Sequence, residues 1–285
     1  MTKAIIPWSM TREEIEKDVQ AHRRARAARL TAERGWLTLI GKVWLREGSH
    51  TIGADARSDI VLPEGRAPAR LGTVTLSSGK VRLDVEGDAE VLARGERVRS
   101  IELRSDAQSA PDDVTMGSLT FQLLQRGDAF ALRIRDAESA ARRSFPGIPA
   151  YPVDPAWRIV ARFEPFTAPR EMAIEDGDGR LQTYLCPGMA HFEKDGTRAT
   201  LLPLFESSEE RLFILFRDRT SRDETSGAGR FLYAPPADGG RILLDFNKAF
   251  NPPCAFTPYA VCPLPPPDND LPMRIEAGEK LPLSV

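Results

Sequence analysis

The sequence has few of the residues that build metal sites and disulfide frameworks. Its 285 residues include three cysteines and three histidines. An odd cysteine count in a chain of this length argues against a disulfide framework, and no group of these residues has the close spacing of a zinc site. The phosphate-binding loop, the dinucleotide-binding glycine motif, the nucleophile elbow and the metalloprotease helix motif are also missing. We therefore expect neither a metal nor a cofactor.

Long apolar runs and an excess of one charge are missing as well. There is no stretch of about 18 apolar residues that would span a bilayer, and the first residues lack the apolar region of a signal peptide. We therefore expect no membrane contact and a cytoplasmic location. Basic residues number 39 and acidic residues 41, for a net charge of −2. This balance predicts no strong attraction to nucleic acid.

What the chain does contain is one helical pattern followed by many short β patterns. Thr11 and Glu14 have the spacing of a capping box, apolar residues then recur at helical spacing, and Gly35 is a plausible stop. After Gly35 the apolar residues alternate, beginning with residues 36–40. Turn residues predict one hairpin over 71–85 and another over 119–134. In the second half we predict strands at 157–163, 171–174, 181–185, 200–205, 212–216, 231–233 and 242–246.

Prolines divide these β patterns into two modules. Four of them, Pro146, Pro149, Pro152 and Pro155, lie close together where the alternation stops, and proline cannot donate to a β-ladder. We predict a helix over residues 1–35, a β-sandwich module over 36–135, a linker over 136–155 and a second β module over 156–285. The expected fold class is mainly β, with two sandwich- or barrel-like modules and a coil-rich C-terminus.

Several motifs carry a resemblance to a known family. They include Glu33-Arg34-Gly35-Trp36-Leu37, Gly229-Arg230-Phe231-Leu232, Asn251-Pro252-Pro253-Cys254-Ala255-Phe256 and Cys262-Pro263-Leu264-Pro265-Pro266. With these motifs the chain, from about residue 10 to 281, resembles the bacterial domain-of-unknown-function family 1684. The resemblance implies kinship and no particular activity. A Thr-Tyr pair would be expected before Gly229, whereas here Thr225 is followed by Ser226, which puts any ring contact at that place in doubt.

A weaker likeness lies in the first half. Gly53 followed by Ser58-Asp59-Ile60-Val61-Leu62 is similar to the opening of a forkhead-associated sandwich. That family has an arginine after the glycine and a Ser-Arg-x-His run after the strand. Here Ala54 follows the glycine, and residues 66–70 contain neither serine nor histidine. Because phosphothreonine binding depends on such polar donors, we do not expect it here.

The best candidate site lies between residues 241 and 269. Strand alternation places Asp245 and Asn247 on one face, and two prolines restrict the backbone next to Asn251. These groups could bind a polar ligand, or they could organise the coil by bonding backbone groups. Arg217 and Arg230 could clamp a carboxylate or phosphate, or they could form ion pairs with Asp218 or Asp245.

Three functions remain open from the sequence. The leading hypothesis is a protein that binds a small polar or anionic molecule through ligand-binding residues Arg217, Arg230, Asp245, Asn247 and Asn251. The second is a hydrolase-type enzyme with Asp245 or Cys254 as the catalytic group, although a small buried cysteine is the commoner case. A Cys254–Cys262 disulfide is allowed by the spacing but is not expected in a reducing compartment. The third is a protein–protein interaction module that uses the helix, Trp36 and Trp44. The oligomeric state is not predicted.

Overall fold

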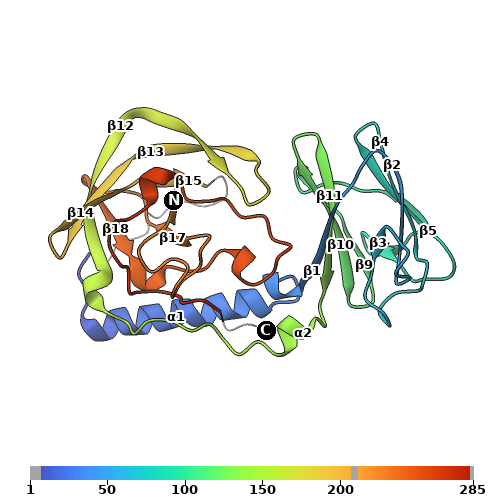
Figure 1. Ribbon diagram of the computed structural model, residues 1–285, viewed down its shortest axis with the longest axis horizontal. Helices are drawn as coiled ribbons and strands as arrows, with labels where there is room; N and C mark the ends of the chain where they lie inside the picture. Colours follow the sequence, from blue (N-terminus) through green and yellow to red (C-terminus); the bar gives the residue numbers. More distant parts are fainter. Residues whose placement is uncertain (1–7, 207–210, 283–285) are drawn as a thin grey trace. The chain divides into compact units, whose positions relative to one another are not determined.

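The structure is a computed structural model that describes residues 8–206 and 211–282. The chain is mainly β, with a long N-terminal helix and several antiparallel sheets (Figure 1), so the predicted fold class is confirmed. It divides into two compact units. We call Leu30–Phe145 the sandwich unit, and Met1–Arg29 together with Pro146–Val285 the coil-rich unit. The finer module boundaries given above stay a prediction.

The sandwich unit contains two sheets that share one apolar core. Its strands are β1 (Leu39–Trp44), β2 (Gly48–Gly53), β3 (Ile60–Val61), β4 (Gly72–Ser77), β5 (Lys80–Val85), β6 (Leu92–Ala93), β7 (Glu96–Arg97), β8 (Ser100–Glu102), β9 (Asp113–Met116), β10 (Leu119–Arg126) and β11 (Ala129–Asp136). One sheet has the order β1-β11-β10-β9-β6-β7 and the other β3-β2-β4-β5-β8. Alternate residues of both sheets, among them Val74, Leu83, Phe121 and Ile134, are buried in the core. A short helix, α2 (Ala140–Arg143), follows.

Both predicted hairpins are present in this unit. Strands β4 and β5 pair from Gly72 to Ser77. They are joined at Ser78 and Gly79, whose φ angles of 52° and 75° belong to the turn type that matches the twist of the strands. Strands β10 and β11 pair over their whole lengths. The sequence therefore located the two turns correctly.

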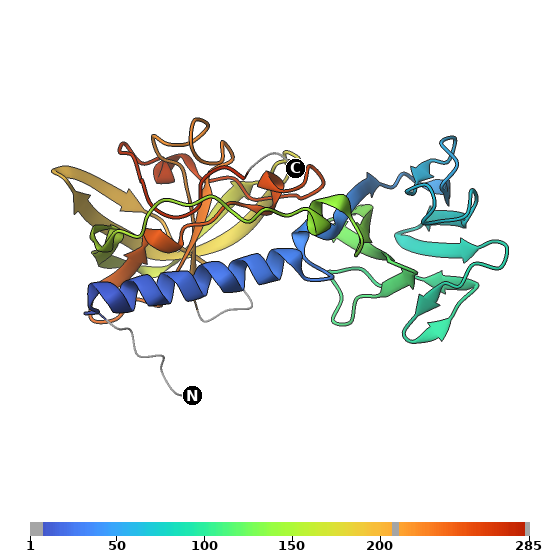
Figure 2. The ribbon, with the colours of Figure 1, turned by 90° about the horizontal axis from the view of Figure 1, so that it is seen from below.

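Helix α1 (Arg12–Thr31) begins with the predicted capping box. The Thr11 backbone N–H donates to Glu14 Oε2 at 2.7 Å, and the Glu14 N–H donates to Thr11 Oγ1 at 3.3 Å. These bonds satisfy donors that have no partner within the helix. The helix runs along the coil-rich unit (Figure 2), where Lys248 contacts Asp18 at 2.6 Å.

The coil-rich unit contains two smaller sheets and a long C-terminal coil. Its strands are β12 (Arg158–Glu175), β13 (Leu181–Lys194), β14 (Thr197–Leu201), β15 (Leu204–Phe205), β16 (Leu212–Phe216), β17 (Arg230–Ala234) and β18 (Arg241–Asp245). The sheet orders are β14-β13-β12-β18 and β15-β16-β17. Both sheets and the coil contribute to one core. At its centre the Phe246 ring meets Trp157 and Phe216 edge to face, with ring centroids 6.1 and 5.5 Å away.

Four strand predictions differ from the structure at prolines and at a turn. The strands predicted at 157–163 and 171–174 are parts of one strand, β12, whose pairing with β13 is irregular between Pro165 and Arg170. The strand predicted at 200–205 is divided into β14 and β15 around Pro203. The stretch predicted as strand at 36–40 begins with a 3₁₀ turn, Trp36–Thr38. Proline breaks the ladder locally because it has no N–H to donate.

No helix in the described part of the chain combines the length and the apolar composition needed to cross a membrane.

Candidate functional site

Arg230 is not a free clamp but the centre of a buried network. Its side chain is 1% exposed and its Nη2 lies 2.5 Å from Asp218 Oδ2. The same guanidinium donates to the carbonyls of Ile275 at 2.8 Å and Ala277 at 2.5 Å. Of the two roles that the sequence left open, the structure shows the ion pair with Asp218. Arg230 therefore binds the C-terminal coil to strand β17.

The residue before Arg230 is a glycine, and neighbouring atoms leave no room for a side chain there. Gly229 has φ +88°, and a Cβ atom there would lie 2.7 Å from the carbonyl oxygen of Phe216 and 2.5 Å from Cγ of Pro265. Only glycine adopts such a conformation without strain and allows so close an approach. The Gly-Arg motif thus places the guanidinium within the coil.

Asp245 and Asn247 lie together, as predicted, and they too are engaged within the protein. The Asn247 amide donates to Asp245 Oδ1 at 3.1 Å, and Arg158 Nη1 donates to Asp245 Oδ2 at 3.0 Å. Asn247 also exchanges two hydrogen bonds of 2.9 Å with the backbone of Asp154. Both side chains are buried. They join the start of β12 to the end of β18.

Asn251 lies in a third buried group, which connects the coil to helix α1. Its backbone N–H donates to Glu279 Oε2 at 2.7 Å, and its amide donates to the Lys280 carbonyl at 2.7 Å. Arg26 of the helix donates to Glu279 Oε1 at 3.2 Å and to the Asn251 carbonyl at 2.8 Å. Burial raises the pKa of Glu279, although Arg26 opposes this shift. Asn251 Oδ1 has no hydrogen-bond partner among the described residues.

The other two predicted residues lie outside these groups. Arg217 is half-buried, and its Nε is 3.4 Å from the carbonyl of Gly227. Cys254 is half-buried in a 3₁₀ turn, and its backbone N–H is 3.2 Å from Cys262 Sγ. The predicted site residues thus lie in three buried groups, around Arg230, around Asp245 with Asn247, and around Asn251, whereas Arg217 and Cys254 have other partners.

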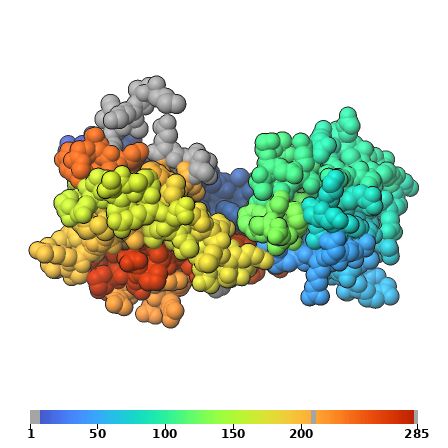
Figure 3. All heavy atoms as spheres, turned by 90° about the horizontal axis from the view of Figure 1, so that it is seen from above, coloured from blue at the N-terminus to red at the C-terminus, as the bar shows by residue number. Residues whose placement is uncertain are grey.

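A pocket that the sequence did not indicate lies on the sheet of β12, β13 and β14. Its volume is about 480 Å³ and its lining consists of Arg162, His191, Phe192, Glu193, Arg198, Ala199 and Thr200. Figure 3 shows β12 and β13, in yellow-green and yellow, at the surface of the coil-rich unit. The polar lining comes from three adjacent strands.

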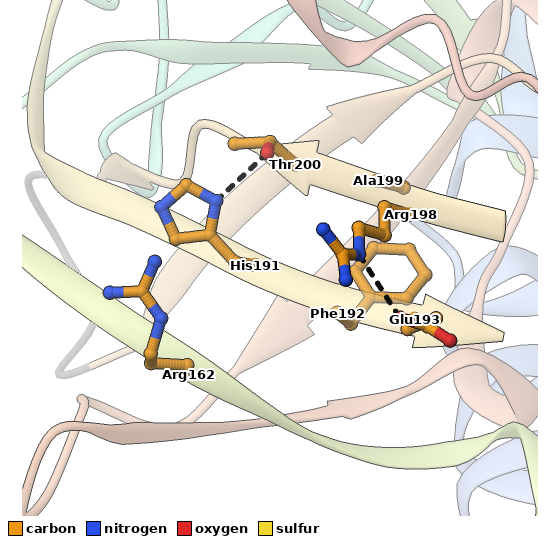
Figure 4. Close-up of a pocket in the computed structure, with 7 residues that line it drawn as sticks. All are labelled: Arg162, His191, Phe192, Glu193, Arg198, Ala199 and Thr200. Carbon is orange, nitrogen blue, oxygen red and sulfur yellow. Dashed lines mark hydrogen bonds and ion pairs between the residues drawn. The ribbon is translucent and has the colours of Figure 1, made fainter. Parts of the chain in front are cut away.

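Strand register explains why three of these side chains lie in one row. Arg162 of β12 pairs with His191 of β13, and His191 pairs with Thr200 of β14. Residues directly opposite one another on neighbouring strands point to the same face of a sheet. Figure 4 shows the imidazole of His191 between Arg162 and Thr200, with its Nδ1 2.9 Å from Thr200 Oγ1. A guanidinium, an imidazole and a hydroxyl therefore face the same space.

Two carboxylates balance the arginines of the pocket. Arg162 Nη1 donates to Glu164 Oε2 at 3.0 Å, and Arg198 Nε donates to Glu193 Oε2 at 3.2 Å. The hydrogen bond from Arg162 lowers the pKa of Glu164, and His191 adds to this shift. Both pairs are exposed: the arginine side chains are 65% and 89% accessible.

The second ring nitrogen of His191, Nε2, makes no well-aligned hydrogen bond with the described residues. It lies 3.4 Å from Glu164 Oε2, within the range of an ion pair. The geometry is nevertheless not that of a hydrogen bond, and Nε2 has no hydrogen-bond partner among the described residues. A buried polar atom without a partner is costly. A ligand in the pocket would supply one.

A second pocket, in the sandwich unit, is smaller, and two of its arginines are paired with a buried carboxylate. It measures about 360 Å³ and includes Arg34, Arg94, Arg104 and Asp112. The Asp112 side chain is 1% exposed and accepts from Arg94 at 2.8 Å and from Arg104 at 2.8 Å. The hydrogen bond from Arg94 holds the pKa of Asp112 well below its usual range, and Arg104 adds to this effect. This carboxylate fixes the arginines in place, so we prefer the first pocket as the candidate site.

The family comparison agrees with the motifs of the C-terminal half. The model of a family described as protein of unknown function, DUF1684, matches residues 143–280. An uncharacterized protein of Haloarcula marismortui, solved by NMR, is 32% identical over 49% of this chain and 78% of its own, with a TM-score of 0.42. The chain belongs to the DUF1684 family. The family-model match is shorter than the range of about 10–281 expected from the sequence. No curated protein sequence matches the chain.

Forkhead-associated (FHA) domains are also among the solved structures to which this DUF1684 member is similar. The FHA-2 domain of a Mycobacterium tuberculosis ABC transporter is 26% identical over 31% of this chain and 77% of that domain, with a TM-score of 0.24. An FHA domain from a study of phosphothreonine-dependent interactions is 17% identical over 32% of this chain and 79% of its own, with a TM-score of 0.23. Neither match assigns a ligand to this chain.

Proposed function

We propose that this protein binds a small polar molecule with an anionic group in the pocket on β12, β13 and β14. The observation that supports this function is the row of Arg162, His191 and Thr200 on adjacent strands, with His191 Nε2 lacking a hydrogen-bond partner among the described residues. Guanidinium, imidazole and hydroxyl groups are suitable donors to a carboxylate or a phosphate. The pocket volume of about 480 Å³ is within the range of small-molecule sites.

The carboxylates in the pocket do not prevent anion binding. Exposed ion pairs such as Arg162–Glu164 contribute only about 0–1 kcal/mol, because water already solvates both charges. An anionic ligand that bonds Arg162 and His191 together can therefore replace Glu164 at small cost. Hydrogen bonds to charged groups contribute about 1.5–3 kcal/mol each. Two such bonds exceed the loss of one exposed pair.

Thermal-shift measurements on the full chain test the proposal. The probes are inorganic phosphate, succinate and adenosine monophosphate, at concentrations up to the millimolar range. We expect at least one probe to raise Tm in a concentration-dependent manner, because a ligand that binds only the folded state stabilises it. We expect Arg162→Gln and His191→Gln each to weaken the binding of that probe at least tenfold, which corresponds to about 1.4 kcal/mol.

Arg82→Gln is a matched control for Arg162→Gln. Arg82 also lies in a strand, is 60% exposed and pairs at 3.0 Å with an acid two residues further along, Asp84. It belongs to the sandwich unit and is not among the residues that line the pocket, so this variant should bind as the wild type does. The proposal fails if no probe shifts Tm, or if both arginine variants weaken binding equally.

The remaining hypotheses receive less support from the geometry. Asp245, the first hydrolase candidate, is buried between Arg158 and Asn247. An interaction module without a small-molecule ligand is the alternative that a negative binding result would favour. The cytoplasmic location and the lack of a nucleic-acid partner stay predictions.

A further inference from the structure

Cys254 and Cys262 lie close together in the C-terminal coil. The Cys254 backbone N–H is 3.2 Å from Cys262 Sγ, although eight positions separate the two residues. Cys262 is 2% exposed, whereas Cys254 is half-buried. One thiol is thus shielded and the other can be reached by a small molecule.

Backbone hydrogen bonds hold each thiol in its place. The Ala255 N–H donates to the Pro252 carbonyl at 3.0 Å, which closes the turn around Cys254. The Gly177 N–H donates to the Cys262 carbonyl at 3.0 Å, which attaches Cys262 to the turn between β12 and β13. Both cysteines therefore lie in segments that backbone hydrogen bonds hold in place.

The surroundings of Cys254 also favour its thiolate form, in contrast to those of Cys186. The hydrogen bond from Cys262 lowers the pKa of the Cys254 thiol, against the opposing effect of burial. Burial instead raises the pKa of the third cysteine, Cys186, whose Sγ donates to the Gly188 carbonyl at 3.2 Å. Because the thiolate is the reactive form, Cys254 should react first.

We propose that Cys254 and Cys262 form a peroxide-oxidisable dithiol, with Cys254 as the attacking residue and Cys262 as the resolving residue. The Cys254 thiolate attacks hydrogen peroxide. The O–O bond breaks, Cys254 becomes a sulfenic acid, and the released hydroxide takes a proton to form water. The Cys262 sulfur then attacks the sulfenic sulfur and loses its proton. The S–O bond breaks, the disulfide forms, and a second water leaves. Two thiols are oxidised and one peroxide is reduced.

The first test treats the reduced full-length protein with one equivalent of hydrogen peroxide. Free thiols are then alkylated under denaturing conditions and the peptides are identified by mass spectrometry. We expect the intact mass to fall by two hydrogen atoms, a Cys254–Cys262 linked peptide to appear, and Cys186 to be alkylated as a free thiol. The proposal is overturned if both cysteines remain alkylatable, or if they appear as sulfinic acids without a disulfide.

Single variants separate the two roles. In Cys262→Ser, we expect Cys254 to stop at the sulfenic acid, which dimedone traps. In Cys254→Ser, we expect the oxidation of Cys262 to be at least tenfold slower. Cys186→Ser is the control and should oxidise at the wild-type rate. Equal oxidation rates for the Cys254→Ser and Cys186→Ser variants would contradict the assignment of Cys254.

Phenylarsine oxide provides a test that needs neither a variant nor an oxidant. Its arsenic bonds two neighbouring thiols and releases its oxygen as water. We expect the native wild-type protein to take up one equivalent and to protect Cys254 and Cys262, but not Cys186, from alkylation. If Cys254 and Cys262 are not protected, the two thiols are too far apart and the proposal is wrong.

Discussion

In the sandwich unit, backbone groups pair in two sheets, and a buried charge such as Asp112 is paired with more exposed arginines, whereas in the coil-rich unit both partners of several ion pairs are buried. Among the described residues of the coil-rich unit, three ion pairs have both side chains no more than 8% exposed: Arg26–Glu279, Arg158–Asp245 and Arg230–Asp218. Pairs on the sandwich sheets, such as Arg82–Asp84, are 60% and 39% exposed. These arginine–carboxylate pairs therefore lie in the interior of the coil-rich unit and at the surface of the sandwich sheets.

The reason lies in the backbone of the coil. A segment without a regular ladder still has N–H and C=O groups that must be paired when they are buried. Asn269 illustrates the solution: its side chain accepts from the Leu202 N–H at 2.7 Å and donates to the Leu215 carbonyl at 2.8 Å. Arg230 does the same for the carbonyls of Ile275 and Ala277. Buried polar residues in this unit replace the missing strand pairing.

The largest expected effect follows from removing Arg230. Arg230→Met leaves the Asp218 carboxylate buried without its partner and frees two coil carbonyls, so we expect unfolding free energy to fall by about 3–5 kcal/mol. Urea unfolding followed by circular dichroism measures this loss. Arg82→Met, at the exposed pair of the sandwich unit, should cost less than about 1 kcal/mol. Equal losses in the two variants would remove the distinction between the units.

This distinction also explains what the sequence could predict. Period-2 alternation and turn residues located the two hairpins of the sandwich unit because pairing and burial there follow the local pattern. The capping box of Thr11 and Glu14 was likewise readable, since both partners lie within one turn of helix. Such signals depend only on neighbours in the chain.

The candidate site was harder to predict, for two physical reasons. The sequence left open whether Asn251 binds a ligand or bonds backbone groups of the coil, because its partners, Glu279 and Lys280, lie 28 and 29 positions away. The pocket residues Arg162, His191 and Thr200 were missed because only cross-strand register brings them into one row. The sequence contains three histidines, and one of them, His191, lies among alternating residues. No motif in the sequence linked this histidine to Arg162 or Thr200, so it did not indicate a site.

A smaller effect is expected from acid, and it should originate in the coil-rich unit. Burial, with added repulsion from Lys248 and Arg29, lowers the pKa of His22 on α1 to about 4. In the unfolded chain this imidazole takes up its proton near pH 6.5. Between these values the unfolded state binds more protons, so stability falls as the pH drops from about 6.5 towards 4. We expect a loss of about 1–2 kcal/mol at pH 5 relative to pH 7.

The variant His22→Leu isolates this contribution. Its unfolding free energy should lose less between pH 7 and pH 5 than that of the wild type, while the difference between the two proteins should be constant from pH 7 to pH 8. Urea unfolding of both proteins at pH 5, 7 and 8 gives the six values needed. If the variant and the wild type lose the same stability on acidification, His22 does not carry the effect.

The smallest effect on unfolding free energy is expected at an exposed ion pair that has a close counterpart in the other unit. Arg162–Glu164 in the coil-rich unit and Arg82–Asp84 in the sandwich unit are exposed pairs of equal length, 3.0 Å, with the same spacing along a strand. Arg162→Gln and Arg82→Gln should each change unfolding free energy by less than about 1 kcal/mol, because solvent screens both pairs. Urea unfolding without ligand checks this equality. A loss for Arg162→Gln alone would mean that Arg162 supports the fold, as Arg230 does, and that weakened binding by this variant is no evidence for a site. Equal stabilities, by contrast, make any difference in probe binding a property of the pocket.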